Sequence, residues 1–217
     1  MRTKHRIIVA IDTRDVDRAR LVAEAVRDHV DAIKVNWPLV LAGGLSVVKE
    51  FSRLGYVLCD LKVADIPNTN RLIVEQAMAA GASGVICHAF VGEDSVRACV
   101  EAAQPGEVFV VTEMSHPGGQ EFTAGHAEDF ARLAVRAGAA GIIAPATRPE
   151  RVKVLRGLVG SKLILAPGVG AQGGRPADAI LAGADAVIVG RAIYEAADPG
   201  AAAEAIEKEI PRAPAAR

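Results

Sequence analysis

Short apolar segments rich in β-branched residues alternate along the chain with longer segments whose apolar residues recur at helical spacing. The apolar segments lie at residues 6–12, 31–36, 57–63, 84–90, 107–114, 140–146, 162–169 and 185–192. Strands that are each followed by a helix predict a parallel sheet. Eight such units predict an α/β fold, a (β/α)8 TIM barrel that spans residues 1–217 as a single domain.

One junction recurs where a predicted helix gives way to the next strand. It reads AGASGVI from residue 80, AGAAGII from 137 and AGADAVI from 182. A glycine directly after a helix is typical of a left-handed C-terminal cap. An open doubly wound sheet is the alternative fold, although it usually has fewer strands in a chain of this length. The last residues, PRAPAAR from 211, are expected to fray.

Composition narrows the class of protein. The chain is 51% hydrophobic and only 4% aromatic, so its core must consist of Ala, Val, Ile and Leu. A net charge of −1 gives no basic surface for nucleic acid. No apolar run reaches the about 18 residues of a membrane helix, and no signal peptide opens the chain. Its three cysteines lack metal-ligand spacing and are read as reduced thiols. We therefore expect a soluble, cytoplasmic protein without nucleic-acid or membrane partners.

Charged residues gather at the ends of the first three predicted strands. The segment DLKVADIPNTN, residues 60–70, places two carboxylates and an ammonium where a buried strand ends. Strand alternation puts Asp60 and Lys62 on the same face of their strand. By the same rule, Asp12 shares a face with Ala10, and Lys34 shares a face with Ala32. Because active sites of barrels lie at the carboxyl ends of the strands, these four side chains predict a site at the barrel mouth. A buried structural ion network is the alternative.

The last two predicted strands end in glycine-rich segments, APGVGAQGG at 166–174 and GRAIY at 190–194. The loops after strands seven and eight of such barrels commonly bind phosphate through backbone N–H groups. Arg191 adds a side chain suited to charge-assisted hydrogen bonds. Strand alternation places it on the same face as Val187 and Val189. A phosphorylated small molecule is therefore the expected ligand. No His/Cys cluster indicates a transition metal, no GxSxG elbow is present, and no dinucleotide fingerprint opens the first strand.

Several motifs together carry a specific resemblance. They are AID at 10–12, IKV at 33–35, DLKVADIPNTN at 60–70, TEMSHPG at 112–118, PGVGAQGG at 167–174 and VGRAIY at 189–194. In this combination the chain resembles the orotidine 5′-monophosphate decarboxylase family in its short archaeal form, within the ribulose-phosphate-binding barrel superfamily. The resemblance extends over nearly the whole chain. Leu61 departs from it, since many members carry an aromatic residue there, but Leu61 is expected to face the helices.

The resemblance implies decarboxylation of orotidine 5′-monophosphate (orotidylate) to UMP, the last step of de novo pyrimidine biosynthesis, without a cofactor. Lys62 matches the lysine that protonates C6 of the pyrimidine, and Asp60 matches the carboxylate nearest the substrate's own. Lys34 and Asp65 complete an alternating Lys–Asp–Lys–Asp array. In the family, Asp65 and Thr69 come from the other subunit of a homodimer.

The resemblance also implies a set of binding residues. Asp12 and Lys34 match contacts to the ribose hydroxyls. Ser115 matches the hydroxyl that reads the pyrimidine, and Gln172 matches the side chain that spans phosphate and ring. The remaining expected contacts belong to the two glycine-rich segments: Pro167, Gly168, Val169, Gly170, Gly190 and Arg191.

Two other functions stay open at this point. The first is a Mg-dependent sugar-phosphate decarboxylase or aldolase of the same superfamily, which typically carries an acidic residue on strand two, where this chain has Lys34. The second is a non-catalytic barrel that senses a phosphorylated ligand. The role of His88, a core residue or a site residue, also stays open, and no role is assigned to Asn36 and Trp37.

Overall fold

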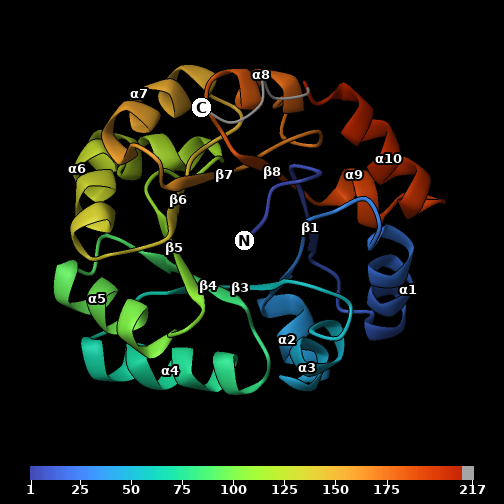
Figure 1. Cartoon of the computed structure of the whole chain (residues 1–217), viewed down its shortest axis with the longest axis horizontal. Coiled ribbons are helices and arrows are strands. Elements are labelled where there is room, and N and C mark those ends of the chain that lie inside the picture. Colours follow the sequence, from blue (N-terminus) through green and yellow to red (C-terminus); the bar gives the residue numbers. More distant parts are fainter. Residues whose placement is uncertain (212–217) are drawn as a thin grey trace.

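A closed barrel of parallel strands is the central feature of the computed structural model, which describes residues 1–211 (Figure 1). Strand order follows the sequence from β1 to β8, and β1 pairs with β8 through Ile7 and Val187, which closes the sheet. The predicted TIM barrel is therefore confirmed, and the open doubly wound sheet is wrong. The predicted fraying at the end of the chain concerns residues that, from 212 on, lie outside the described part.

The strands match the eight predicted segments, although most are shorter. Their bounds are β1 Ile7–Ile11, β2 Ala32–Asn36, β3 Val57–Val63, β4 Gly84–His88, β5 Glu107–Val111, β6 Gly141–Ile143, β7 Leu163–Pro167 and β8 Ala186–Val189. Residues at the predicted carboxyl ends of several strands, such as 144–146 after β6, instead begin the loops. Those loops form the mouth of the barrel.

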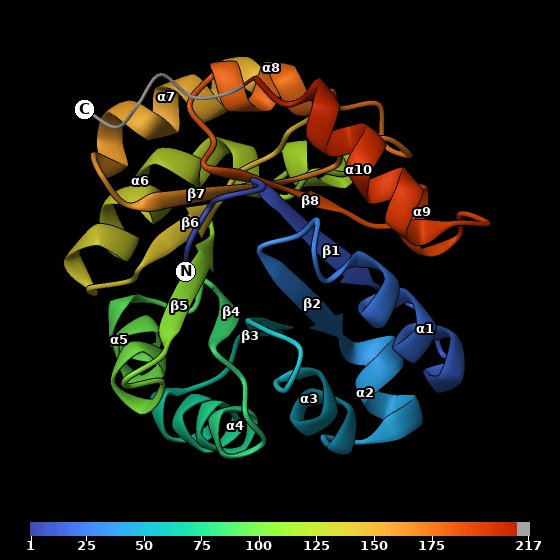
Figure 2. The ribbon, with the colours of Figure 1, turned by 45° about the vertical axis from the view of Figure 1, so that its right-hand side comes forward.

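Helices surround the sheet, as the turned view shows (Figure 2). Their bounds are α1 Val16–Val26, α2 Trp37–Gly43, α3 Ser46–Phe51, α4 Pro67–Ala79, α5 Glu93–Ala102, the 3-10 helix η1 Pro117–Gln120, α6 Thr123–Arg136, α7 Pro149–Val159, α8 Pro176–Leu181, α9 Arg191–Tyr194 and α10 Pro199–Glu209. Among residues 1–211, no helix is long and apolar enough to cross a membrane. The recurring helix-to-strand junction is confirmed as a cap, because Gly81, Gly138 and Gly183 all have positive φ.

Alternation along the strands divides the core into two layers. One layer lies between the sheet and the helices and includes Leu61, Val187 and Val189. The other fills the barrel interior, with members Ile8, Ala10, Ala32, Leu58, Ile86, Phe109, Val111, Ile143, Leu165, Ala186 and Ile188. The predicted inward faces of the first three strands and the outward position of Leu61 are thereby confirmed.

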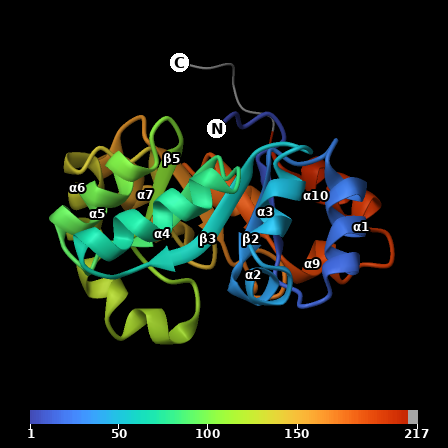
Figure 3. The same cartoon turned by 90° about the horizontal axis from the view of Figure 1, so that it is seen from below.

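The N-terminal end of the barrel is closed by side chains that bind backbone groups. The Asp31 carboxylate accepts hydrogen bonds from the backbone N–H groups of Lys4, His5 and Arg6, at 2.8, 3.0 and 2.6 Å. Asp185 accepts from the N–H of Ile164 at 2.7 Å. Met1 lies at this end, over the centre of the barrel, and packs against the interior layer (Figures 1 and 3). These contacts fix the starts of the strands.

Candidate active site

A cavity of about 290 Å³ opens at the carboxyl ends of the strands. The predicted site residues that line it are Asp12, Lys34, Asp60, Lys62, Ser115, Pro167, Gly168, Val169, Gln172, Gly190 and Arg191. Its floor consists of the uppermost residues of the interior layer, among them Ala10, whose small side chain leaves room for a ligand. The cavity therefore brings together residues as far apart in the chain as Asp12 and Arg191.

Four alternating charges lie along one wall of the cavity, on β3, β2 and the end of β1. The Asp60 carboxylate accepts hydrogen bonds at 2.8 Å from the Nζ atoms of both Lys34 and Lys62. Lys34 Nζ also lies 3.4 Å from Oδ1 of Asp12. The side chains of Lys34 and Asp60 are only 6% and 7% exposed, whereas that of Lys62 is 34% exposed. Lys62 is thus the more accessible of the two lysines.

Each buried member of the array keeps its charge because its neighbours outweigh the cost of burial. Burial acts against the ammonium of Lys34, but Asp60 and Asp12 raise its pKa above the ordinary value. Burial likewise acts against the Asp60 carboxylate, yet Lys34 and Lys62 lower its pKa below the ordinary value. The wall therefore presents fixed positive and negative charges to whatever occupies the cavity.

The backbone at Lys62 has an unusual conformation. Its φ of 46° lies in the left-handed region, which non-glycine residues rarely adopt. The pairing of β3 with β4 is irregular over the same stretch, between Cys59 and Val63. Strained conformations of this kind persist where the surrounding structure imposes them, and they cluster at functional sites. Here the strain coincides with the residue whose ammonium contacts Asp60 at the cavity.

Asp65, Thr69 and Gly170 are the predicted site residues that do not line this cavity. Asp65 is exposed in the loop after β3, where its N–H donates to the side-chain oxygen of Asn70 at 2.8 Å. Thr69 is half-buried in the first turn of α4. A single chain therefore brings neither Asp65 nor Thr69 to the Lys–Asp array.

Arg191 lines the cavity although strand alternation predicts that it faces the helices. Its predicted partners Val187 and Val189 face the helices, so the same face would carry Arg191 away from the site. Strand β8 ends at Val189, however, and Gly190 has a φ of −105° and a ψ of −104° that redirect the chain into α9. The grouping of Arg191 with these valines was therefore wrong. Tyr194, at the end of α9, also lines the cavity and was not predicted.

The loop that carries Ser115 is held by ion pairs that the sequence did not reveal. Glu113 is fully buried, and its two carboxylate oxygens accept from Nε of Arg148 and Nε of Arg151 at 2.8 and 3.0 Å. The Thr147 hydroxyl donates to the carbonyl of Ser115 at 3.2 Å. Gly168 packs so closely that a Cβ there would lie 2.9 Å from the Thr147 methyl group. The available signal was an acidic residue, Glu113, near the end of the apolar segment predicted at 107–114.

His88 lies at the end of β4, outside the cavity lining, with its ring 5.0 Å from that of Phe90. Burial, and secondly the nearby ammonium of Lys62, lower the pKa of His88. Asn36 lines the cavity, and the indole of Trp37 donates to the carbonyl of Leu61. Within residues 1–211 no group of three or more His, Cys, Asp or Glu side chains is arranged to hold a metal ion.

The fold and the cavity define the class: a (β/α)8 barrel with a charged small-molecule site at the carboxyl ends of its strands. The model of the orotidine 5′-phosphate decarboxylase / HUMPS family matches residues 5–206. The chain belongs to this family, and the resemblance carried by its motifs is confirmed.

Individual relatives agree with the family. The chain is 55% identical over 213 residues to the orotidine 5′-phosphate decarboxylase of Methanococcoides burtonii, covering 97% of this chain and 99% of that protein. It is similar to the crystal structure of orotidine 5′-monophosphate decarboxylase from Methanocaldococcus jannaschii in complex with the inhibitor BMP, with a TM-score of 0.91 and 41% identity over 95% of this chain and 98% of that one. The crystal structure of orotidine 5′-phosphate decarboxylase from Pyrococcus horikoshii matches with a TM-score of 0.88 and 47% identity, over 94% of this chain and 98% of that one.

Proposed function

We propose that this chain decarboxylates orotidine 5′-monophosphate to UMP without a metal or an organic cofactor. The observation that carries the proposal is the Asp60 carboxylate held at 2.8 Å from both Lys34 and Lys62 on the cavity wall. Loss of carbon dioxide from the substrate leaves negative charge on C6 of the pyrimidine. Preorganised cations that face this carbon stabilise the transition state without having to reorient.

Within this array, Lys62 is the proposed general acid. It is the more accessible lysine, and its three N–H donors leave a proton available for C6 while it contacts Asp60. Asp60 orders both ammonium groups and lies nearest the carboxylate that departs. Lys34, buried and bonded to Asp60 and Asp12, supplies positive charge and a ribose contact rather than the proton.

The other cavity residues are assigned to substrate binding. Asp12 and Lys34 contact the ribose, Ser115 reads the pyrimidine, and Gln172 spans ring and phosphate. The phosphate lies against Arg191 and the glycine-rich segments 167–170 and 190, with Tyr194 beside them. Binding energy from the phosphate is then used at the distant reacting carbon.

Arg191→Ala tests the phosphate contact. The variant should lower kcat/KM for orotidylate by the equivalent of about 2–5 kcal/mol, as expected for loss of a charge-assisted contact to the bound phosphate. Orotidine, which lacks the phosphate, should be turned over almost equally by the variant and the wild type. Equal losses on both substrates would make Arg191 a structural residue.

An absorbance assay with orotidylate in excess EDTA tests the function as a whole. Turnover should persist at full rate after complete chelation. Loss of activity on chelation, restored by added Mg²⁺, would favour the metal-dependent sugar-phosphate chemistry, against which the ammonium of Lys34 at the second strand already argues. Binding of UMP without any turnover of orotidylate would leave a ligand sensor.

We further propose a homodimer in which each cavity receives Asp65 and Thr69 from the other subunit. Asp65 is exposed beside Ile66, which is 65% exposed. Large apolar side chains are also exposed after the strands on either side of β3. After β2, Trp37 is 43% exposed and Leu41 is 78% exposed, and after β4, Phe90 is 60% exposed. Exposed apolar side chains that gather on one surface are typical of an interface between subunits. A two-fold axis through this surface would direct Asp65 toward the partner's Lys62.

Mixing two inactive variants tests the shared site. Lys62→Ala and Asp65→Asn, mixed under subunit exchange, should form about half heterodimers with one intact site in two, so about a quarter of wild-type activity per subunit returns. If Asp65 serves its own barrel, every site keeps a lesion and mixing restores nothing. Exchange is verified separately with subunits that carry different affinity tags.

A further inference from the structure

Helix α9 brings Arg191 and Tyr194 to the cavity, although it spans only Arg191–Tyr194. A helix of one turn has no stability of its own, because the entropy of forming a turn exceeds what its few hydrogen bonds return. Its last carbonyl groups also lack partners within the helix. The orientation of both side chains therefore depends on contacts between α9 and its neighbours.

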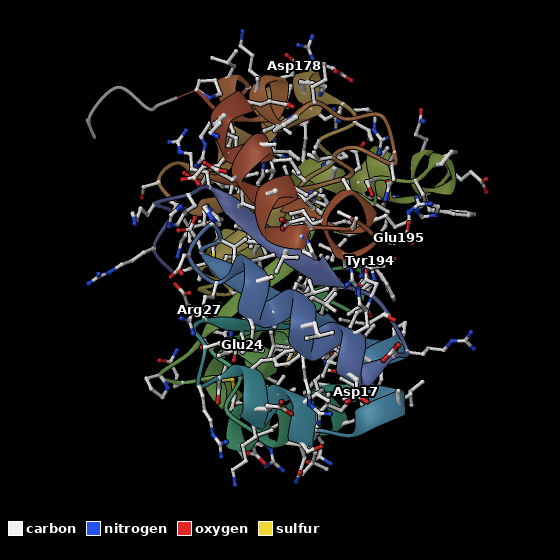
Figure 4. All side chains as sticks on the ribbon, turned by 90° about the vertical axis from the view of Figure 1, so that its right-hand side faces the viewer. Asp17, Glu24, Arg27, Asp178, Tyr194 and Glu195 are labelled. Atoms are coloured by element: carbon white, nitrogen blue, oxygen red, sulfur yellow. The ribbon has the colours of Figure 1, made fainter. Side chains whose placement is uncertain are left out.

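Arg18, in the first turns of α1, supplies such a contact. Its Nε and Nη2 atoms donate to the carbonyl of Tyr194 at 3.3 and 3.1 Å, and Nη2 also donates to the carbonyl of Ala196 at 2.6 Å. In the side view, the labelled Tyr194 and Glu195 lie at the same end of the molecule as Asp17 of α1 (Figure 4). A cation at the carboxyl end of a helix also interacts favourably with the helix dipole.

The Arg18 side chain starts from a fixed position. The carboxylate of Asp15, the N-cap of α1, accepts from the backbone N–H of Arg18 at 2.9 Å. Helix α1 itself follows β1, at whose end Asp12 lines the cavity. Arg18 thus ties the segment that carries Arg191 to the βα unit that carries Asp12, two residues that our proposed function places at the phosphate and the ribose.

We propose that Arg18 is a positioning residue for phosphate recognition. It does not line the cavity, and it acts by holding the carboxyl end of α9 through the planar fork of its guanidinium, so that Arg191 faces the ligand. This inference rests on the proposed function, because it requires that Arg191 bind the substrate phosphate. A lysine would place a single ammonium there and cannot reproduce the fork.

Arg18→Met tests the proposal, with Arg20→Met as the matched control. Arg20 lies on the same helix but pairs with Asp17 and Glu50 on the surface. Arg18→Met should lower kcat/KM for orotidylate by about tenfold to a hundredfold, the range expected from displacing a binding group by roughly 1 Å. It should weaken UMP binding in calorimetry by a similar factor. Turnover of unphosphorylated orotidine should not change, and Arg20→Met should match the wild type on both substrates.

The double variant Arg18→Met/Arg191→Ala shows whether Arg18 acts through Arg191. The double variant should be no slower on orotidylate than Arg191→Ala alone, because coupled residues are not additive. Equal losses on orotidylate and orotidine, or additive losses in the double variant, would overturn the proposal while Arg191→Ala still discriminates the two substrates. If Arg191→Ala does not discriminate them, the assignment of the phosphate site fails instead, and the role of Arg18 fails with it. Should Arg18→Met not fold, Arg18→Lys, with the same expected selectivity, replaces it.

Discussion

The two ends of the barrel both carry carboxylates, but Asp31 at one end and Asp60 at the other bind different partners. At the N-terminal end, Asp31 accepts from three backbone N–H groups, and Asp185 accepts from one and also pairs with the guanidinium of Arg156. At the C-terminal end, the Asp60 carboxylate accepts from two ammonium groups, those of Lys34 and Lys62. The first arrangement fixes the chain, whereas the second fixes charges.

This difference separates structural from functional charge. A carboxylate that binds the N–H groups at the start of strands has completed its role when the strands are in place. A carboxylate between two lysines instead orients cations, and one of these, Lys62, remains partly exposed at the cavity. Changes at the two ends should therefore separate effects on catalysis from effects on stability.

Lys62→Ala should have the largest effect. Loss of the proton donor and of a transition-state cation should lower kcat for orotidylate by more than about 10⁴-fold. UMP should still bind, and the melting temperature should change little, since the side chain is partly exposed. Lys49→Ala, an exposed lysine of α3, is the control. Near-normal kcat for Lys62→Ala would remove the lysine from the mechanism.

Asp60→Asn should affect both catalysis and stability, and the stability effect should depend on pH. Near neutral pH the variant should lose about 3 kcal/mol of unfolding free energy, because a buried ion pair is broken from one side. The pKa of Asp60 is lowered in the folded chain, so its contribution is complete above the unfolded value of about 4 and is lost as the pH falls through the lower folded value. Urea unfolding should show the gap between variant and wild type closing on acidification. A gap that is constant with pH would contradict this.

The raised pKa of Lys34 sets the alkaline limit of the stability that the ion pairs contribute. Its contribution is complete below the unfolded value of about 10.4 and is lost only as the pH rises through the higher folded value. The array should therefore be intact across the whole neutral range.

Asp31→Ala, at the other end of the barrel, should affect stability alone. Three backbone N–H groups lose their acceptor, which should cost about 2 kcal/mol of unfolding free energy. The kcat/KM for orotidylate should equal that of the wild type. Asp28→Ala, an exposed neighbour, controls for loss of charge. A selective loss of activity in Asp31→Ala would show that the two ends are not independent.

Much of the fold could be predicted because its signals are local. Each strand is a short apolar run, and each inward residue follows from alternation, as Ala10, Ala32 and Leu58 show. Strand ends were placed too late, because Ala144 and Ala146 are buried beyond the end of β6 and their N–H groups still donate to carbonyls of β7, those of Leu165 and Pro167. Alternation cannot indicate where a strand stops.

The same limit of strand alternation explains which site residues could be predicted from the sequence. Asp12, Lys34, Asp60 and Lys62 lie within strands or directly after one, and alternation predicts that they face one cavity. Arg191 and Tyr194 lie beyond the end of β8, where the conformation of Gly190 decides their direction. Glu113 was missed because its partners, Arg148 and Arg151, come from the start of α7, beyond η1, α6 and β6 in the chain, a contact that only the tertiary structure reveals.

Deuterium exchange at C6 of UMP tests the role of Lys62 most directly, because it isolates proton transfer from loss of carbon dioxide. If Lys62 donates the proton to C6, the same ammonium–amine pair must catalyse the reverse step by microscopic reversibility. In D2O the wild-type protein should therefore incorporate deuterium at C6 of bound UMP, as followed by NMR, and Lys62→Ala, saturated with UMP, should not. Exchange by Lys62→Ala at the wild-type rate would assign the proton to another group and contradict the mechanism.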